Sequence, residues 1–187
     1  MIKSGPYVVS ELENVVQLAS SKGISLSDHL SVTEKSDLRA YMSLVHNVLE
    51  KSLLYFTWLD NDIYTNLTRH RVGSPYNFPL KSLVPWVSRR KATAQLKGLK
   101  WAERKPDEVY KEVETCLIAL SERLGDAEFF FGEKPTELDA LVFGYIFTMI
   151  TTPLNDENKF GNLVKQQGNL VRLCQRLEKD FFSSKEN

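Results

Sequence analysis

Apolar residues recur along most of the chain at the three- and four-residue spacing of an α-helix. The longest such segment runs from 31 to 59, and shorter ones occupy 80–99, 106–124 and 163–182. Helices are also expected at 10–22 and 136–151, with 61–71 a short helix or an irregular continuation. Tyr7-Val8-Val9, after Gly5-Pro6, has the character of a brief strand. The pattern therefore predicts an all-α fold with a strand and one helix at its N-terminus.

Two of the expected helices begin with a capping box, in which a hydroxyl residue and an acid three positions later satisfy each other's backbone N–H groups. Ser31 and Glu34 form one such pair, and Thr136 and Asp139 form the other. The helix after Thr136 is apolar on nearly all faces, so we expect it at the centre of the fold. A cap is worth about 0.5–2 kcal/mol. We interpret all four residues as fold-capping.

Charge is balanced overall but uneven locally. The 24 basic and 24 acidic side chains cancel, which gives no support for nucleic-acid binding. Between Lys81 and Lys105, however, eight cations face the single acid Glu103. The candidate interaction surface within this segment consists of Arg89, Arg90, Lys91, Lys97, Lys100 and Arg104. It is either a solvated helix face or a surface for anionic headgroups or an acidic partner, where each cation contributes about 1 kcal/mol.

The residue types that carry metal or nucleophilic chemistry are scattered. His29, His46 and His70 have no metal-ligand spacing with Cys116 or Cys174. Both cysteines fall on apolar helical stripes, which favours buried thiols in a reducing compartment. The longest apolar stretch, 140–154, is shorter than the roughly 20 residues that span a bilayer. We expect no metal, no cofactor, no catalytic residue and no membrane anchor in this chain.

Several segments carry a resemblance to known families. The sequence FFGEKPTELDA at 130–140 resembles the C-terminal domain of glutathione transferases, where a Ser/Thr-x-x-Asp box caps the central buried helix. PTELDALVFGY at 135–145 is most similar to the metaxins. Four further segments are also similar to metaxins, the last two to their type-two branch: VVSEL at 8–12, KGISLSD at 22–28, YFTW at 55–58 and RVGSPY at 71–76.

The resemblance extends over almost the whole chain and implies a domain organisation. Residues 31–187 would form a helical bundle like the C-terminal domain of glutathione transferases. Residues 1–23 would be a strand-helix remnant of a thioredoxin-like half, whose earlier part the chain is expected to lack. In glutathione transferases the activating Tyr, Ser or Cys lies in that earlier part. Ser10-Glu11 reverses the order of the pair that holds glutathione in that family, and Ser10 fits a helix N-cap better.

The same resemblance implies a function and partners. It indicates a non-catalytic scaffold at the cytosolic face of the mitochondrial outer membrane, peripheral to the bilayer and cytosolic when unpartnered. The implied partners are a membrane-anchored type-one metaxin and the barrel subunit of the machinery that sorts and assembles β-barrel proteins, with no nucleic acid. One alternative is an adaptor for motor-based mitochondrial transport, partnered by a motor-adaptor GTPase. Another alternative is a glutathione-binding, transferase-like enzyme.

Overall fold

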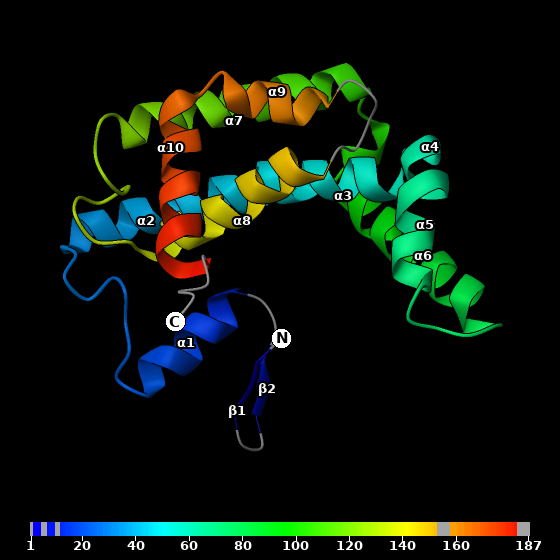
Figure 1. The fold of residues 1–187 in the computed structure, drawn as a ribbon, viewed down its shortest axis with the longest axis horizontal. Helices are drawn as coiled ribbons and strands as arrows, with labels where there is room; N and C mark the ends of the chain where they lie inside the picture. The colour runs from blue at the N-terminus through cyan, green and yellow to red at the C-terminus, as the bar shows by residue number, and fades with distance from the viewer. Residues whose placement is uncertain (1, 5–6, 10–11, 153–157, 183–187) are drawn as a thin grey trace.

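The N-terminal segment forms a small hairpin followed by one helix. The structure is a computed structural model that describes residues 2–4, 7–9, 12–152 and 158–182. Strand β1 (Ile2–Ser4) pairs antiparallel with β2 (Tyr7–Val9), with Ile2 opposite Val9. Helix α1 (Leu12–Ser21) follows, and an irregular stretch leads to the main bundle (Figure 1). The strand at Tyr7–Val9 was expected, whereas the sequence pattern did not predict its partner.

A long helical rod runs through the bundle. It consists of α2 (Val32–Val45), a π-helical turn (His46–Glu50) and α3 (Lys51–Trp58). The rod ends as the 31–59 periodicity predicts, and its inward positions Val45, Leu49 and Phe56 are almost fully buried. Because these positions recur at helical spacing, the rod presents a continuous apolar face to the rest of the bundle.

Three further helices close the core around this rod. They are α7 (Pro106–Leu124), α8 (Glu137–Thr151) and α10 (Gly168–Leu177). Helix α8 packs against α2, α10 and the short α9 (Lys159–Lys165), and the buried face of α7 supplies Val113, Leu117 and Leu120 to the same core. This arrangement confirms the predicted all-α class.

Two expectations about the elements differ from the structure. The helix expected at 163–182 is divided into α9, α10 and a π-helical turn (Glu178–Phe182), and α9 and α10 each pack against both α7 and α8. Helix α8 is buried on one side, but its small residues Ala140, Gly144 and Thr148 face solvent. Apolar composition predicted burial all round; small side chains, however, expose little apolar surface and permit an open side.

A second group of helices extends from the far end of the rod. It contains α4 (Asn61–Ile63), a π-helical turn (Tyr64–Thr68), α5 (Arg69–Gly73) and α6 (Leu80–Gly98), and we call residues 61–98 the α4–α6 lobe. Figure 1 shows these helices at the right-hand end of the molecule, away from α1 and α10. Helix α6 packs on α5 and α3. No described helix is both long and apolar enough to cross a bilayer.

Candidate interaction surface

Helix α6 positions most of the cations that the sequence singled out. The helix begins at Leu80, ahead of Pro85, which lies inside it and is buried. With Pro85, Ala92 and Leu96 facing the protein, the opposite side of the helix is turned outward. The six predicted surface cations divide into two groups, those that are engaged within the fold and those that are exposed.

Arg89 is half-buried and engaged within the fold. Its Nε donates to the carbonyl oxygen of Trp58 at 2.9 Å, and its Nη2 donates to Oδ1 of Asn61 at 2.6 Å. The guanidinium also lies 4.1 Å from the ring centroid of Tyr64. A cation at the C-terminal end of α3 neutralises the negative end of the helix dipole. Arg89 therefore attaches α6 to α3 and α4.

Arg104 is engaged in the same way at the start of α7. It forms an ion pair with Glu112, and its guanidinium lies 4.3 Å from the ring centroid of the buried Trp101. Its own carbonyl accepts from the Tyr55 hydroxyl at 2.9 Å. The remaining four cations, Arg90, Lys91, Lys97 and Lys100, are exposed. Two of the six predicted residues thus hold the fold, and four face outward.

A shallow hollow lies along the outward side of α6. Its volume is about 390 Å³. It is lined by Trp86, Arg89, Arg90, Thr93, Ala94 and Lys97. The Arg90 guanidinium lies 5.1 Å from the centroid of the Trp86 ring, a cation–π distance. The hollow therefore combines three cations with an aromatic wall and contains no acid.

Exposed apolar side chains beside these cations were missed by the sequence analysis. Phe78 is 88% exposed, Trp86 52%, and Leu80 and Leu83 48% each. They lie on the α5–α6 connection and the first turns of α6. One signal was present in the sequence: no Asp or Glu occurs from 63 to 102. An acid-free stretch that still carries aromatic residues marks an unusual surface.

The two capping boxes differ in their surroundings. At the start of α2, the Glu34 carboxylate accepts from the Ser31 N–H at 2.8 Å and the Ser31 hydroxyl at 2.7 Å, in an exposed position. These bonds lower the pKa of Glu34. At the start of α8, the fully buried Asp139 carboxylate accepts from the Thr136 N–H and hydroxyl, each at 2.8 Å.

The Asp139 carboxylate also links two segments. Its Oδ1 accepts from the Phe130 N–H at 3.0 Å, which ties the loop after α7 to the start of α8. Burial raises the pKa of Asp139, and the hydrogen bonds from Thr136 and Phe130 oppose this in part. The group therefore does more than cap one helix, because it fixes the entry of the chain into the core.

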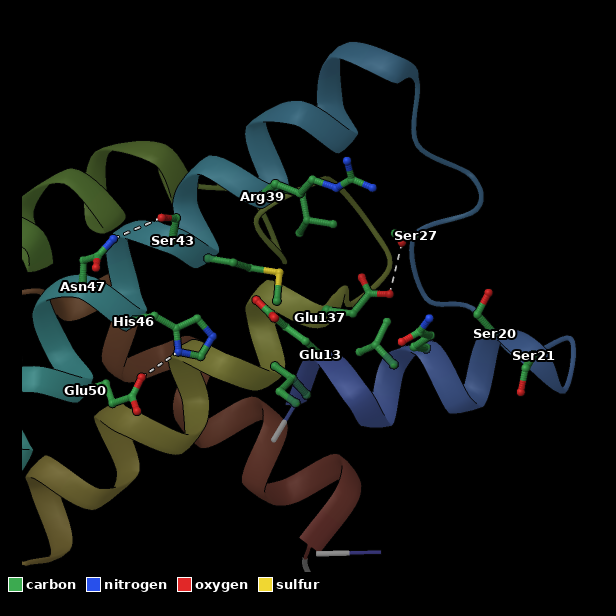
Figure 2. A pocket seen from close by; sticks show the side chains of 15 residues that line it. Glu13, Ser20, Ser21, Ser27, Arg39, Ser43, His46, Asn47, Glu50 and Glu137 are labelled. Carbon is green, nitrogen blue, oxygen red and sulfur yellow. Dashed lines mark hydrogen bonds and ion pairs between the residues drawn. The ribbon is translucent and has the colours of Figure 1, made fainter. Parts of the chain in front are cut away.

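A larger hollow, of about 1070 Å³, separates α1 from α2 and the start of α8 (Figure 2). Figure 2 shows Glu137 directed toward Ser27, whose hydroxyl donates to the Glu137 carboxylate at 3.1 Å. Glu137 is 4% exposed, and its Oε2 has no hydrogen-bond partner among the described residues. On the rim, His46 Nδ1 lies 2.9 Å from Glu50 Oε2. Sequence reasoning did not single out Glu137, because its hydrogen-bond partner Ser27 lies 110 positions away in the chain.

The thiols and the possible metal ligands lie in positions that the structure also describes. Cys116 and Cys174 are both buried, and burial raises their pKa values to about 12 and about 11. A thiol with so high a pKa is protonated at neutral pH and is a poor nucleophile or metal ligand. Among the described residues, no three His, Cys, Asp or Glu side chains group as a metal site would require.

Comparison with known proteins finds a matching family for each of two parts of the chain. Residues 1–89 match the model of a family described as outer mitochondrial membrane transport complex protein. Residues 113–177 match the model of the glutathione S-transferase C-terminal domain. No solved structure matches the chain.

Curated relatives extend over nearly the whole sequence. Human metaxin-2 is 40% identical over 98% of this chain and 70% of its own length. The metaxin-2 homologue of Caenorhabditis elegans is 34% identical over 81% of this chain and 66% of its own length. Human metaxin-1 is 34% identical over 67% of this chain and 28% of its own length. The helical fold, the family matches and these identities together show that the chain belongs to the metaxin family, on its metaxin-2 branch.

Proposed function

We propose that this chain is a non-catalytic scaffold subunit at the cytosolic face of the mitochondrial outer membrane. In this role it takes part in the sorting and assembly of β-barrel proteins. It acts together with a membrane-anchored metaxin of the type-one branch and the barrel subunit of that machinery. The observation that carries the proposal is the family membership, joined to the match of residues 1–89 with an outer mitochondrial membrane transport family.

The burial of the cysteines and the exposed side chains of the lobe support a role in which the protein binds partners through its surface. The two cysteines are buried with raised pKa values, so neither is suited to nucleophilic attack. By contrast, the α4–α6 lobe exposes cations and large apolar side chains together. Clusters of exposed apolar residues on a soluble domain mark interaction sites. These features support a role in binding rather than in catalysis.

Capture by the type-one partner tests the scaffold role. The chain is co-expressed with the soluble part of a type-one metaxin, captured through a tag on that partner, and passed over a size-exclusion column. We expect a stable complex that contains the chain and the type-one metaxin in equal amounts. Circular dichroism of the chain alone provides the folding control. A folded chain that does not associate would contradict the scaffold role.

The enzyme alternative has one observation in its favour, the hollow between α1 and α2 with its buried Glu137. A cavity of this size is large enough for a small ligand. Calorimetric titration with glutathione separates the two functions. We expect no saturable heat in the micromolar range. Saturable binding that is lost in Glu137→Gln would favour a glutathione-binding protein over a scaffold.

A further inference from the structure

The charge of the chain is divided between two regions. Residues 63–102 contain eight cations and no acid. Since the whole chain has 24 cations and 24 acids, the remainder has 16 cations against all 24 acids. The neutral total therefore conceals a positive segment, which covers the α4–α6 lobe except for Asn61 and Asp62, and a negative remainder. A field of this kind orients the molecule near a charged surface, with the lobe leading toward negative charge.

Helix α6 places apolar and basic residues on one side. Leu83, Trp86 and Arg90 follow one another at three- and four-residue spacing, and Val87, Ala94 and Lys97 fall on the same side. This outward side stands opposite the buried stripe of Pro85, Ala92 and Leu96. Its first turns are apolar and its last turns are basic, so the face has an apolar end and a cationic end.

The apolar end continues into the loop before the helix. Phe78 is 88% exposed, and Tyr76 and Leu80 are more than two-fifths exposed. Figure 1 shows the α5–α6 connection at the outer end of the lobe. Aromatic and aliphatic side chains at such a tip can enter a layer of headgroups without rearrangement of the core, since none of them belongs to the core cluster.

We infer that the α4–α6 lobe docks on an anionic phospholipid bilayer, with Phe78, Leu83 and Trp86 among the headgroups and Arg90 and Lys97 on lipid phosphates. The inference rests on the proposed function in so far as that function places the chain at a membrane. The argument for a bilayer is the combination of charge and shape. A cationic, acid-free face complements anionic lipids, and Trp and Phe favour the bilayer interface.

The arrangement also explains why both ends of the face are needed. Each exposed cation strengthens attraction to an anionic surface by about fivefold, but screening by salt limits this contribution. Shallow insertion of apolar side chains adds attraction that salt does not screen. Arg89 is not part of the lipid contact, because its donors are directed to Trp58 and Asn61.

Co-sedimentation with vesicles tests the inference. The full chain is mixed with vesicles of phosphatidylcholine alone, or with one-fifth of it replaced by phosphatidylserine. We expect binding to the anionic vesicles only. Arg90→Glu with Lys97→Glu should weaken this binding at least about tenfold, since two attractive charges become repulsive. Phe78→Ser with Trp86→Ser should weaken this binding by a similar factor. It should leave the salt dependence of the binding unchanged, since the cations remain.

Matched variants outside the lobe provide the controls. Lys165→Glu with Lys179→Glu reverses two exposed cations of the bundle, and Ile118→Ser removes an apolar side chain that is 41% exposed on α7. Both controls should bind anionic vesicles like the unaltered chain. Because all the substituted side chains are exposed, the variants should keep the native circular dichroism spectrum and unfolding midpoint.

The outcomes separate this inference from the proposed function. Equal binding to neutral vesicles, or binding that either lobe variant leaves unchanged, overturns the lipid contact. If the chain does not bind vesicles but the lobe variants lose the type-one partner, the face binds a protein. That outcome also overturns the lipid contact. Vesicle binding that depends on the lobe, in a chain that never captures the partner, supports the lipid contact while the scaffold role fails.

Discussion

At the scale of single residues, Asp139 is a buried acid held by several donors. Its carboxylate is fully buried and accepts three hydrogen bonds, two from Thr136 and one from Phe130. Burying a carboxylate is costly unless donors surround it. The same motif at Ser31 and Glu34 lies at the surface, where water can replace any bond that is lost. The two boxes are thus a matched pair that differ in burial.

Replacing Asp139 should therefore cost more than replacing Glu34. In Asp139→Asn, an amide NH₂ group replaces one carboxylate oxygen and faces the donors from which that oxygen accepted hydrogen bonds. Buried donors are then left without an acceptor. We expect the free energy of unfolding to fall by about 1–3 kcal/mol. Glu34→Gln keeps a residue that capping boxes accept, so it should change little. Urea denaturation of both variants measures the difference, and equal losses would contradict the role of burial.

Asp139 also predicts a dependence on pH. Burial raises its pKa in the folded chain above the ordinary value of 3.8. In the interval between those two pKa values the folded chain binds the proton more tightly than the unfolded chain does. The stability contributed by this group therefore falls as the pH rises through that interval. The stability difference between the unaltered chain and Asp139→Asn, followed by urea denaturation from pH 3.8 upward, should show that decline.

At the scale of elements, the contact between α5 and α6 positions α6 within the lobe. A Cβ added to Gly73 would lie 2.6 Å from the carbonyl oxygen of Lys81, a backbone atom that cannot move without moving α6. Helix α6 is then attached to α3 by Arg89. The exposed face of α6 is consequently positioned by a close backbone approach on one side and by the half-buried Arg89 on the other.

Gly73→Ala should destabilise the chain by about 1–3 kcal/mol, as overpacking does elsewhere. Gly144→Ala is the matched control, because that glycine lies within α8 and has no atom within 4 Å of the added Cβ. There, alanine should stabilise the helix by about 0.5–1 kcal/mol. Urea denaturation compares the two. A Gly73→Ala variant as stable as the unaltered chain would mean that the α5–α6 contact yields easily.

At the scale of the whole molecule, the N-terminal segment and the bundle are unequally buried. Helix α1 has no buried residue, and from that helix Leu12 is the side chain that packs against the core cluster. From Leu30 onward the chain enters the core. This supports our proposal that 1–23 and 31–187 are separate units.

Removal of residues 1–23 should therefore leave a cooperatively folded bundle. Because little apolar surface of α1 is buried, we expect only a small shift in the midpoint of urea denaturation. Circular dichroism and denaturation of the shortened chain measure this. Broad, non-cooperative unfolding would show that the N-terminal segment belongs to the same unit as the bundle.

Much of the helical architecture followed from local chemistry. Helix starts at Ser31, Pro106 and Thr136 are marked by residues that satisfy backbone N–H groups within three positions. The apolar periodicity of 31–59 and 106–124 similarly indicated which side of each helix would be buried. Such signals are contained in a few neighbouring residues, so the sequence alone determines them.

Other properties depended on residues far apart in the chain. Arg89 and Arg90 are neighbours of the same type, yet Arg89 reaches the Trp58 carbonyl while Arg90 faces outward. The buried Glu137 accepts a hydrogen bond from Ser27, which is 110 positions away. Charge and spacing identified where cations cluster, but only tertiary packing decided which of them the fold uses and which remain for a partner. Local hydrogen bonding specifies helices, whereas exposure is a property of the packed whole.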